Sequence, residues 1–149
     1  MAPPFAGRLP AAGLGRLRGV ETAERARRVM ELLGRGRLDD LVKLSHPDVE
    51  WHSFFAELGE GSVYRGVDGM RQYVRDLQEA WEFVRAEVDD TVAVGEVAVL
   101  VGQIHFQGRG SGVEMSLAAG WMLKFRDEKV ELFRAFREPE AALEAVGLA

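Results

Sequence analysis

Apolar residues recur at helical spacing in three early segments of the chain. The spacing predicts a first helix from about Glu21 to Gly34 and a short second helix within residues 38–44. A third helix begins near Val67, where apolar residues again recur every three or four positions. The apolar positions of the three helices are Ala26, Val29, Met30 and Leu33, then Leu38, Leu41, Val42 and Leu44, then Val67, Met70, Val74, Leu77 and Trp81.

The remainder of the chain has the composition and alternation of strands. The sequence predicts a first strand at residues 49–53, a loop at 54–66, and four longer strands at about 82–94, 96–108, 113–126 and 129–137. Turns are predicted at the glycine-rich residues 108–112 and at 127–129, and a short closing helix ends at Gly147. Helices followed by a sheet are typical of an α+β domain.

Composition changes this picture mainly at the N-terminus. A chain of 149 residues with 47% hydrophobic and 29% charged residues is expected to form one domain. Residues 1–19 contain prolines, glycines and arginines without periodicity, so they are predicted to be a flexible tail that precedes a domain at 20–149.

Charge and cysteine content exclude several classes of function. The net charge is −5, but eight arginines against three glutamates give residues 1–37 a charge of +5, which leaves −10 for the rest. An acidic body repels phosphates, so nucleic-acid binding is not expected. The absence of cysteine fits a cytoplasmic protein, and no apolar run has the length of a membrane span. We therefore expect no membrane association.

Five short motifs occur in an order that resembles a known family. They are His-Pro-Asp-Val-Glu-Trp (46–51), Tyr-Arg-Gly-Val-Asp-Gly-Met (64–70), Gly-Arg-Gly-Ser-Gly-Val-Glu (108–114), Phe-Arg-Asp-Glu-Lys-Val (125–130) and the segment 138–148. Their order and spacing resemble the SnoaL-like branch of the nuclear transport factor 2-like superfamily, over about residues 20–148. That superfamily includes polyketide cyclases, ketosteroid isomerases and limonene epoxide hydrolase.

The resemblance implies a cone-shaped fold, in which a curved mixed sheet wraps around three N-terminal helices and encloses a pocket. It also implies a homodimer formed through the outer surface of the sheet. Such a pocket suits a small hydrophobic carbonyl compound. The protein would then be either a lyase, cyclase or isomerase that needs no cofactor, or a non-catalytic binding or dimerisation module, because fold alone does not assign chemistry.

Two reactions of the superfamily are not expected of this chain. Ketosteroid isomerases use an Asp base with a Tyr and a protonated Asp, and the corresponding positions here are Ser53, Val29 and Trp121. The Asp–Arg–Asp set of limonene-type epoxide hydrolases corresponds to Gln103, His105 and Ala135. Neither set of catalytic groups is present.

The same alignment implies which side chains point into the pocket. His105 is the candidate catalyst, because histidine exchanges a proton near neutral pH, and Glu131 or Glu138 would be its carboxylate partner. The alignment implies a ligand-binding role for Trp51, Ser53, Tyr64, Gln103, Trp121, Phe133 and Arg137. The alternative for the two tryptophans is a place in the packed core, and for Arg137 an ion pair with Glu138 or the last helix.

The orientation of His105 depends on the register of one strand. Simple alternation turns Leu100, Ile104 and Phe106 inward and leaves His105 outside. The alignment with the family implies the reverse, and we expect the alignment to hold because dimerisation buries the outer face of such sheets. The other histidines, His46 and His52, do not cluster with His105 as a metal site requires, so no metal is expected.

Overall fold

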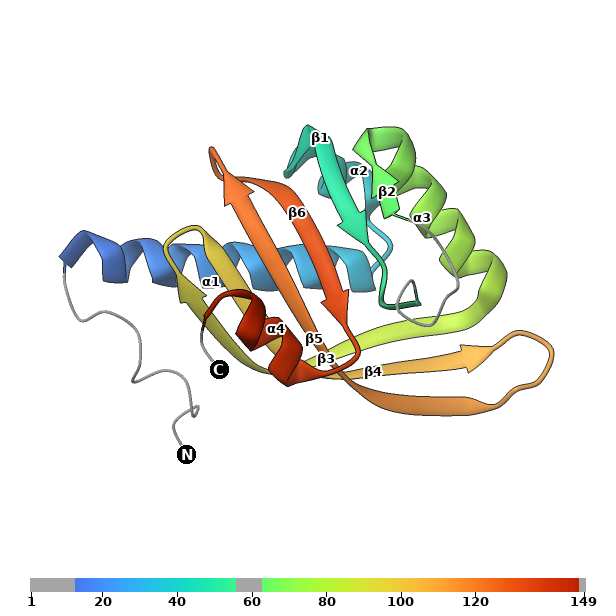
Figure 1. Cartoon of the computed structure of the whole chain (residues 1–149). Coiled ribbons are helices and arrows are strands. Elements are labelled where there is room, and N and C mark those ends of the chain that lie inside the picture. The colour runs from blue at the N-terminus through green and yellow to red at the C-terminus, as the bar shows by residue number, and fades with distance from the viewer. Residues whose placement is uncertain (1–12, 56–62, 148–149) are drawn as a thin grey trace.

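The computed structural model describes residues 13–55 and 63–147, which form a curved six-stranded sheet with helices on both faces (Figure 1). The strand order is β2-β1-β6-β5-β4-β3, and every neighbouring pair is antiparallel except β1 and β6. The elements are α1 (Gly13–Gly34), α2 (Leu38–Lys43), β1 (Ser45–His52), β2 (Val63–Arg65), α3 (Gly66–Ala80), β3 (Trp81–Val94), β4 (Val97–Gly108), β5 (Glu114–Arg126), β6 (Lys129–Phe136) and α4 (Pro139–Ala145). The predicted α+β fold is confirmed.

The N-terminal boundary of the domain differs from the prediction. Helix α1 begins at Gly13, so residues 13–19 are helical and are not part of a flexible tail. At Gly19 the helix lies so close to β3 that an added Cβ would be 3.3 Å from the carbonyl oxygen of Ala93. Adding residues to an existing helix costs far less free energy than nucleating a new one. Helix α1 therefore includes residues 13–19, although their sequence has little apolar periodicity. Residues 1–12 of the predicted tail lie outside the described residues.

Helices α1 and α3 cover the inner face of the sheet. Val29 of α1 and Met70 of α3 are buried together with Leu100, Ile104 and Phe106 of β4. Burial of these side chains removes the apolar stripes of both helices from water, which is the main contribution to the stability of such a fold. The inner face therefore carries Ile104 and Phe106, the two neighbours of His105 along β4, and not His105 itself.

Two stacked aromatic rings lie at the centre of the inner face of the sheet. The rings of Trp51 on β1 and Phe133 on β6 lie 3.9 Å apart between centroids and 7° from parallel. Both side chains are about 1% exposed. The rings stack because Trp51 and Phe133 are paired directly across the parallel strands β1 and β6. The stack joins the last strand of the chain to the first.

The outer face is covered at one end by α4 (Figure 1). Ala142 and Leu143 of α4 are buried with Val92 and Val99 of the sheet. At Gly120 of β5 the helix approaches so closely that an added Cβ would be 2.9 Å from the Cβ of Ala142. Part of the surface that the family resemblance assigns to dimerisation is thus occupied by the chain's own last helix.

A bulge bends the sheet at the middle of β3. Val88 pairs with Gly102 and Asp90 pairs with Val101, so Asp89 is an extra residue on β3. A Cβ at Gly102 would lie 1.9 Å from the carbonyl oxygen of Glu87, which only a residue without a side chain avoids. Bulges increase the local twist of a strand pair, and glycine permits the close backbone approach. The β3–β4 pair therefore curves around the helices.

Gly102→Ala is expected to destabilise the protein, because the new methyl group would overlap the Glu87 carbonyl. We expect the free energy of unfolding to fall by about 2 kcal/mol in urea denaturation. The matched control is Gly34→Ala at the end of α1, where an added Cβ meets nothing within 4 Å; its effect should stay within about 0.5 kcal/mol. Equal stability of the two variants would contradict the bend described here.

Candidate functional site

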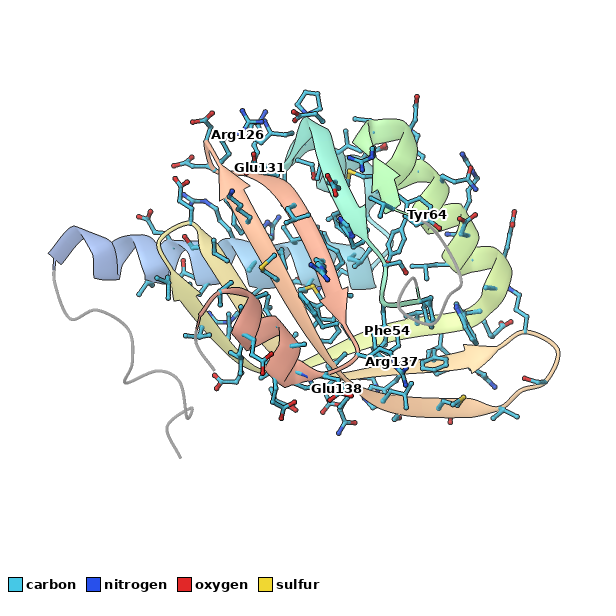
Figure 2. The ribbon with its side chains drawn as sticks, viewed as in Figure 1. Phe54, Tyr64, Arg126, Glu131, Arg137 and Glu138 are labelled. Atoms are coloured by element: carbon cyan, nitrogen blue, oxygen red, sulfur yellow. The ribbon has the colours of Figure 1, made fainter. Side chains whose placement is uncertain are left out.

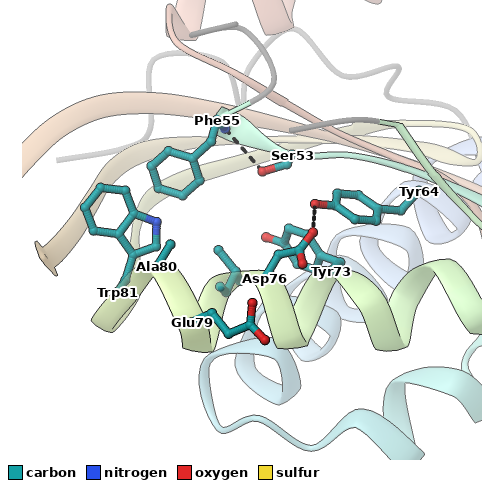
Figure 3. A pocket seen from close by; sticks show the side chains of 9 residues that line it. Ser53, Phe55, Tyr64, Tyr73, Asp76, Glu79, Ala80 and Trp81 are labelled. Atoms are coloured by element: carbon teal, nitrogen blue, oxygen red, sulfur yellow. Dashed lines mark hydrogen bonds between the residues drawn. The ribbon is translucent and has the colours of Figure 1, made fainter. Parts of the chain in front are cut away.

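A cavity of about 390 Å³ lies between the end of β1, the strand β2, the C-terminal half of α3 and the start of β3 (Figure 3). The position follows from chain connectivity, because β3 starts directly where α3 ends and carries Trp81 back toward the end of β1. The residues that line the cavity are Ser53, Phe55, Tyr64, Tyr73, Asp76, Leu77, Glu79, Ala80 and Trp81.

One side of the cavity is held by a hydrogen bond between β2 and α3. The Tyr64 hydroxyl donates to Asp76 Oδ2 at 2.5 Å, and Gln72 Nε2 donates to Asp76 Oδ1 at 2.6 Å (Figure 3). The bond from Tyr64, followed by that from Gln72, lowers the pKa of the Asp76 carboxyl. Burial, with the adjacent Asp76 carboxylate, raises the pKa of Tyr64 to about 12. At neutral pH the pair is a carboxylate and a neutral phenol.

The opposite side of the cavity is aromatic. The rings of Phe55 and Trp81 are stacked at 5.1 Å between centroids, and both also contact Phe106 edge-on. Tyr73 forms the floor next to Tyr64, and burial raises the pKa of its hydroxyl to about 12. These rings give the cavity walls that suit the apolar parts of a ligand.

Ser53 positions the aromatic wall where β1 ends. Its hydroxyl oxygen accepts a hydrogen bond from the Phe55 backbone N–H at 3.2 Å, a local turn of the kind that serine favours. The side chain is buried at the edge of the cavity, and its own hydroxyl proton can be donated to a ligand. Of the residues predicted to bind ligand, Ser53 and Tyr64 line the cavity.

Leu77 of α3 separates the cavity from a second, inner void. The inner void, of about 50 Å³, lies between the helices and the sheet and is lined by Leu77, Trp121 and Phe133 among other apolar residues. Trp51, Trp121 and Phe133, which were expected to point into the pocket, are buried on the inner face of the sheet. All three are packed in the core, however, and none of them lines the larger cavity.

The predicted orientation of His105 is wrong. His105 lies on the outer face of the sheet, where Nδ1 is 2.6 Å from Ser116 Oγ and Nε2 is 2.6 Å from Glu87 Oε2. Its neighbours Ile104 and Phe106 are buried on the inner face. The burial of these apolar residues decides the register, because a shift by one residue would exchange every side chain between the two faces. His105 and Trp51 therefore do not share a pocket.

Other predicted site residues also lie away from the cavity. Gln103 is exposed on the outer face with His105. Arg137 and Glu138 lie at the end of β6 beside α4, far from Glu131 at the other end of that strand (Figure 2). Glu131 forms ion pairs with Lys124 and Arg126, so neither predicted carboxylate is the partner of His105.

Several residues of the cavity were not predicted from the sequence. Tyr73, Asp76 and Glu79 are spaced by three along α3, and together they form a stripe beside the apolar one. The spacing alone did not distinguish this stripe from a solvated helical face, because only Tyr73 is buried and Glu79 is exposed. Phe55 gave no signal either, because it belongs to a segment expected to be a loop.

Two further kinds of feature, a membrane-spanning helix and a metal site, are absent from the described part of the chain. Within it, no helix is long and apolar enough to cross a membrane. No three His, Asp or Glu side chains there are grouped in a way that could hold a metal ion.

The curved sheet around α1 and α3, with a cavity at its open end, defines a cone-shaped protein of the nuclear transport factor 2-like fold. The model of the SnoaL-like domain family matches residues 26–133, and the chain belongs to this family. The search of curated proteins finds no match.

Solved structures show the same fold at low sequence identity. A nuclear transport factor 2-like protein of unknown function from Burkholderia pseudomallei is 18% identical with a TM-score of 0.70, covering 85% of this chain and 98% of its own. TerC, crystallised with polyporic acid, is 18% identical with a TM-score of 0.69 and coverages of 83% and 96%. A Catenulispora acidiphila protein of ketosteroid isomerase-like fold, in complex with trimethylamine, is 13% identical with a TM-score of 0.68 and coverages of 85% and 94%.

Tyr64→Phe is expected to lower the free energy of unfolding, by an amount that depends on pH. Because the folded state lowers the pKa of Asp76, the interaction stabilises the protein above the unfolded pKa of that group and is lost as the pH falls through the folded pKa. We expect the variant to lose about 1 kcal/mol at neutral pH. The difference from the wild type should shrink on acidification, as measured by urea denaturation.

Tyr73→Phe is the matched control for this pH series. Its hydroxyl is buried and its pKa is raised to about 12, so its contribution to stability does not change in acid. A constant difference between Tyr64→Phe and wild type at every pH would contradict the role assigned to the Asp76 carboxylate.

Proposed function

We propose that this SnoaL-like protein binds a small organic molecule in the cavity beside α3. The observation that carries the proposal is the cavity itself, whose volume of about 390 Å³ is in the range of small-molecule sites. It combines the aromatic side chains of Phe55 and Trp81 with the polar groups of Ser53 and Asp76, which is the usual composition of a ligand pocket. Two proteins of the same fold were crystallised with small organic compounds, which is consistent with this proposal.

Binding without catalysis is better supported than acid–base chemistry. A general acid or base is most effective when its pKa lies near the working pH. In this cavity the pKa of Asp76 is lowered, and the pKa values of Tyr64 and Tyr73 are raised to about 12. These shifts move all three groups away from neutrality, and His105 lies on the other face of the sheet. A cyclase, lyase or isomerase that depends on His105 is therefore not proposed.

We also propose that the protein forms a homodimer and that it is cytoplasmic. A homodimer would use the outer surface of β3 and β4 near Glu87 and His105, which lies beyond the part packed against α4. A cytoplasmic location is proposed because the chain contains no cysteine.

The binding proposal is tested by filling the cavity. Ala80 lines it at the end of α3, so Ala80→Trp should occupy the space that a ligand needs. With the neutral fluorescent probe 1-aminoanthracene, we expect wild-type protein to bind and Ala80→Trp to bind at least about tenfold more weakly, which corresponds to about 1.4 kcal/mol.

Two controls make this titration specific. Ala145→Trp adds the same side chain at an exposed position of α4, and His105→Ala removes the histidine from the outer face. Both variants should bind the probe as the wild type does. Undiminished binding by Ala80→Trp, or loss of binding in His105→Ala, would place the site elsewhere.

A further inference from the structure

The cavity has a one-sided charge. Among the described residues that line it, Asp76 and Glu79 are acidic and none is lysine, arginine or histidine. Both acidic residues belong to α3 and lie one turn apart, so their carboxylates are on neighbouring parts of the same wall. Asp76 is half-buried and Glu79 is exposed to solvent, so a ligand in the cavity has one partly screened and one exposed carboxylate on the same side.

These charges are not neutralised by ion pairs within the described part of the chain. Asp76 accepts hydrogen bonds from Tyr64 and Gln72, both of which are uncharged. The nearby Arg75 donates to Gln72 Oε1 at 2.9 Å and forms no ion pair with Asp76, although its positive charge contributes to the lowered pKa of that carboxyl. Glu79 has no ion pair either. A cation in the cavity would add to the partial compensation that Arg75 gives Asp76 and would be a counter-charge for Glu79.

The rest of the wall suits a cation with apolar substituents. Phe55, Trp81, Tyr64 and Tyr73 surround the space opposite and beside the carboxylates (Figure 3). Aromatic rings attract organic cations through their electron-rich faces, and they contact alkyl groups without desolvating polar atoms. A carboxylate or phosphate ligand would instead be repelled by Asp76 and Glu79 and would find no basic partner.

We propose that the ligand of the cavity is an organic cation, an amine or quaternary ammonium compound whose charge lies near Asp76 and Glu79 and whose apolar groups contact the aromatic wall. This inference rests on the proposed function, since it specifies the class of molecule that the same cavity takes. It replaces the neutral carbonyl compound expected from the sequence, for which the cavity offers few donors.

The test compares three probes of the same shape and different charge. Choline is a cation, 3,3-dimethylbutan-1-ol replaces its nitrogen by carbon, and 3,3-dimethylbutanoate is an anion. In isothermal titration of the full chain at low ionic strength, choline should bind at least about tenfold more tightly than the alcohol, and the anion should bind most weakly.

Substitution of the carboxylates identifies the source of this preference. Glu79→Gln and Asp76→Asn should each weaken choline binding by about threefold or more and leave the alcohol unchanged. Asp68→Asn is the matched control, because Asp68 is an exposed acidic residue in the first turn of α3 and does not line the cavity. Glu79 makes no hydrogen bond that supports the fold, so its variant remains informative if Asp76→Asn is unstable.

The possible outcomes separate the two proposals. Equal affinity for choline and the alcohol, with 1-aminoanthracene still bound, would overturn the cation inference and leave the small-molecule site intact. Tighter binding of the anion would also overturn it. Absence of binding for all three probes and for 1-aminoanthracene would overturn the proposed function itself.

Discussion

The bend where Asp89 bulges opposite Gly102 is the constraint on which the inner side of this protein depends. The β3–β4 pair curves at this bulge, and Ile104 and Phe106 share one buried core with residues of α1 and α3. The start of β3 lies at the C-terminal end of α3 because Trp81 follows Ala80 directly. Trp81 then reaches Phe55 at the end of β1, and the space left between these elements is the cavity.

The link between Tyr64 and Asp76 has a second consequence, because it joins an edge strand to a helix. Strand β2 has only three residues and pairs with β1 alone, so its backbone bonds give little stability. The phenol–carboxylate bond attaches β2 to α3 and keeps one wall of the cavity in place. The same bond holds Asp76 in its charged form, so the geometry and the electrostatics of the cavity have one cause.

The fold could be predicted from the sequence because local patterns and burial agree along most of the chain. The stripe of Met70, Val74 and Leu77 predicts α3, and the alternation of Leu100, Ile104 and Phe106 predicts both β4 and its buried face. The family resemblance implies the wrong face for His105, because burial of Ile104 and Phe106 fixes the register of β4 and a one-residue shift exchanges its two faces. The cavity itself could not be predicted, since Asp76 in a helix resembles any solvated carboxylate until Tyr64, twelve residues earlier, is placed beside it.

Among the residues that the structure describes, Leu77 alone lines the cavity, the inner void and a third hollow beside α1. Together with Tyr73, which also lines the cavity and the inner void, it forms a thin partition between these spaces. A shorter side chain at this position would connect separate spaces without moving the backbone. The volume open to a ligand in this protein is therefore set by the length of one helical side chain as well as by the curvature of the sheet.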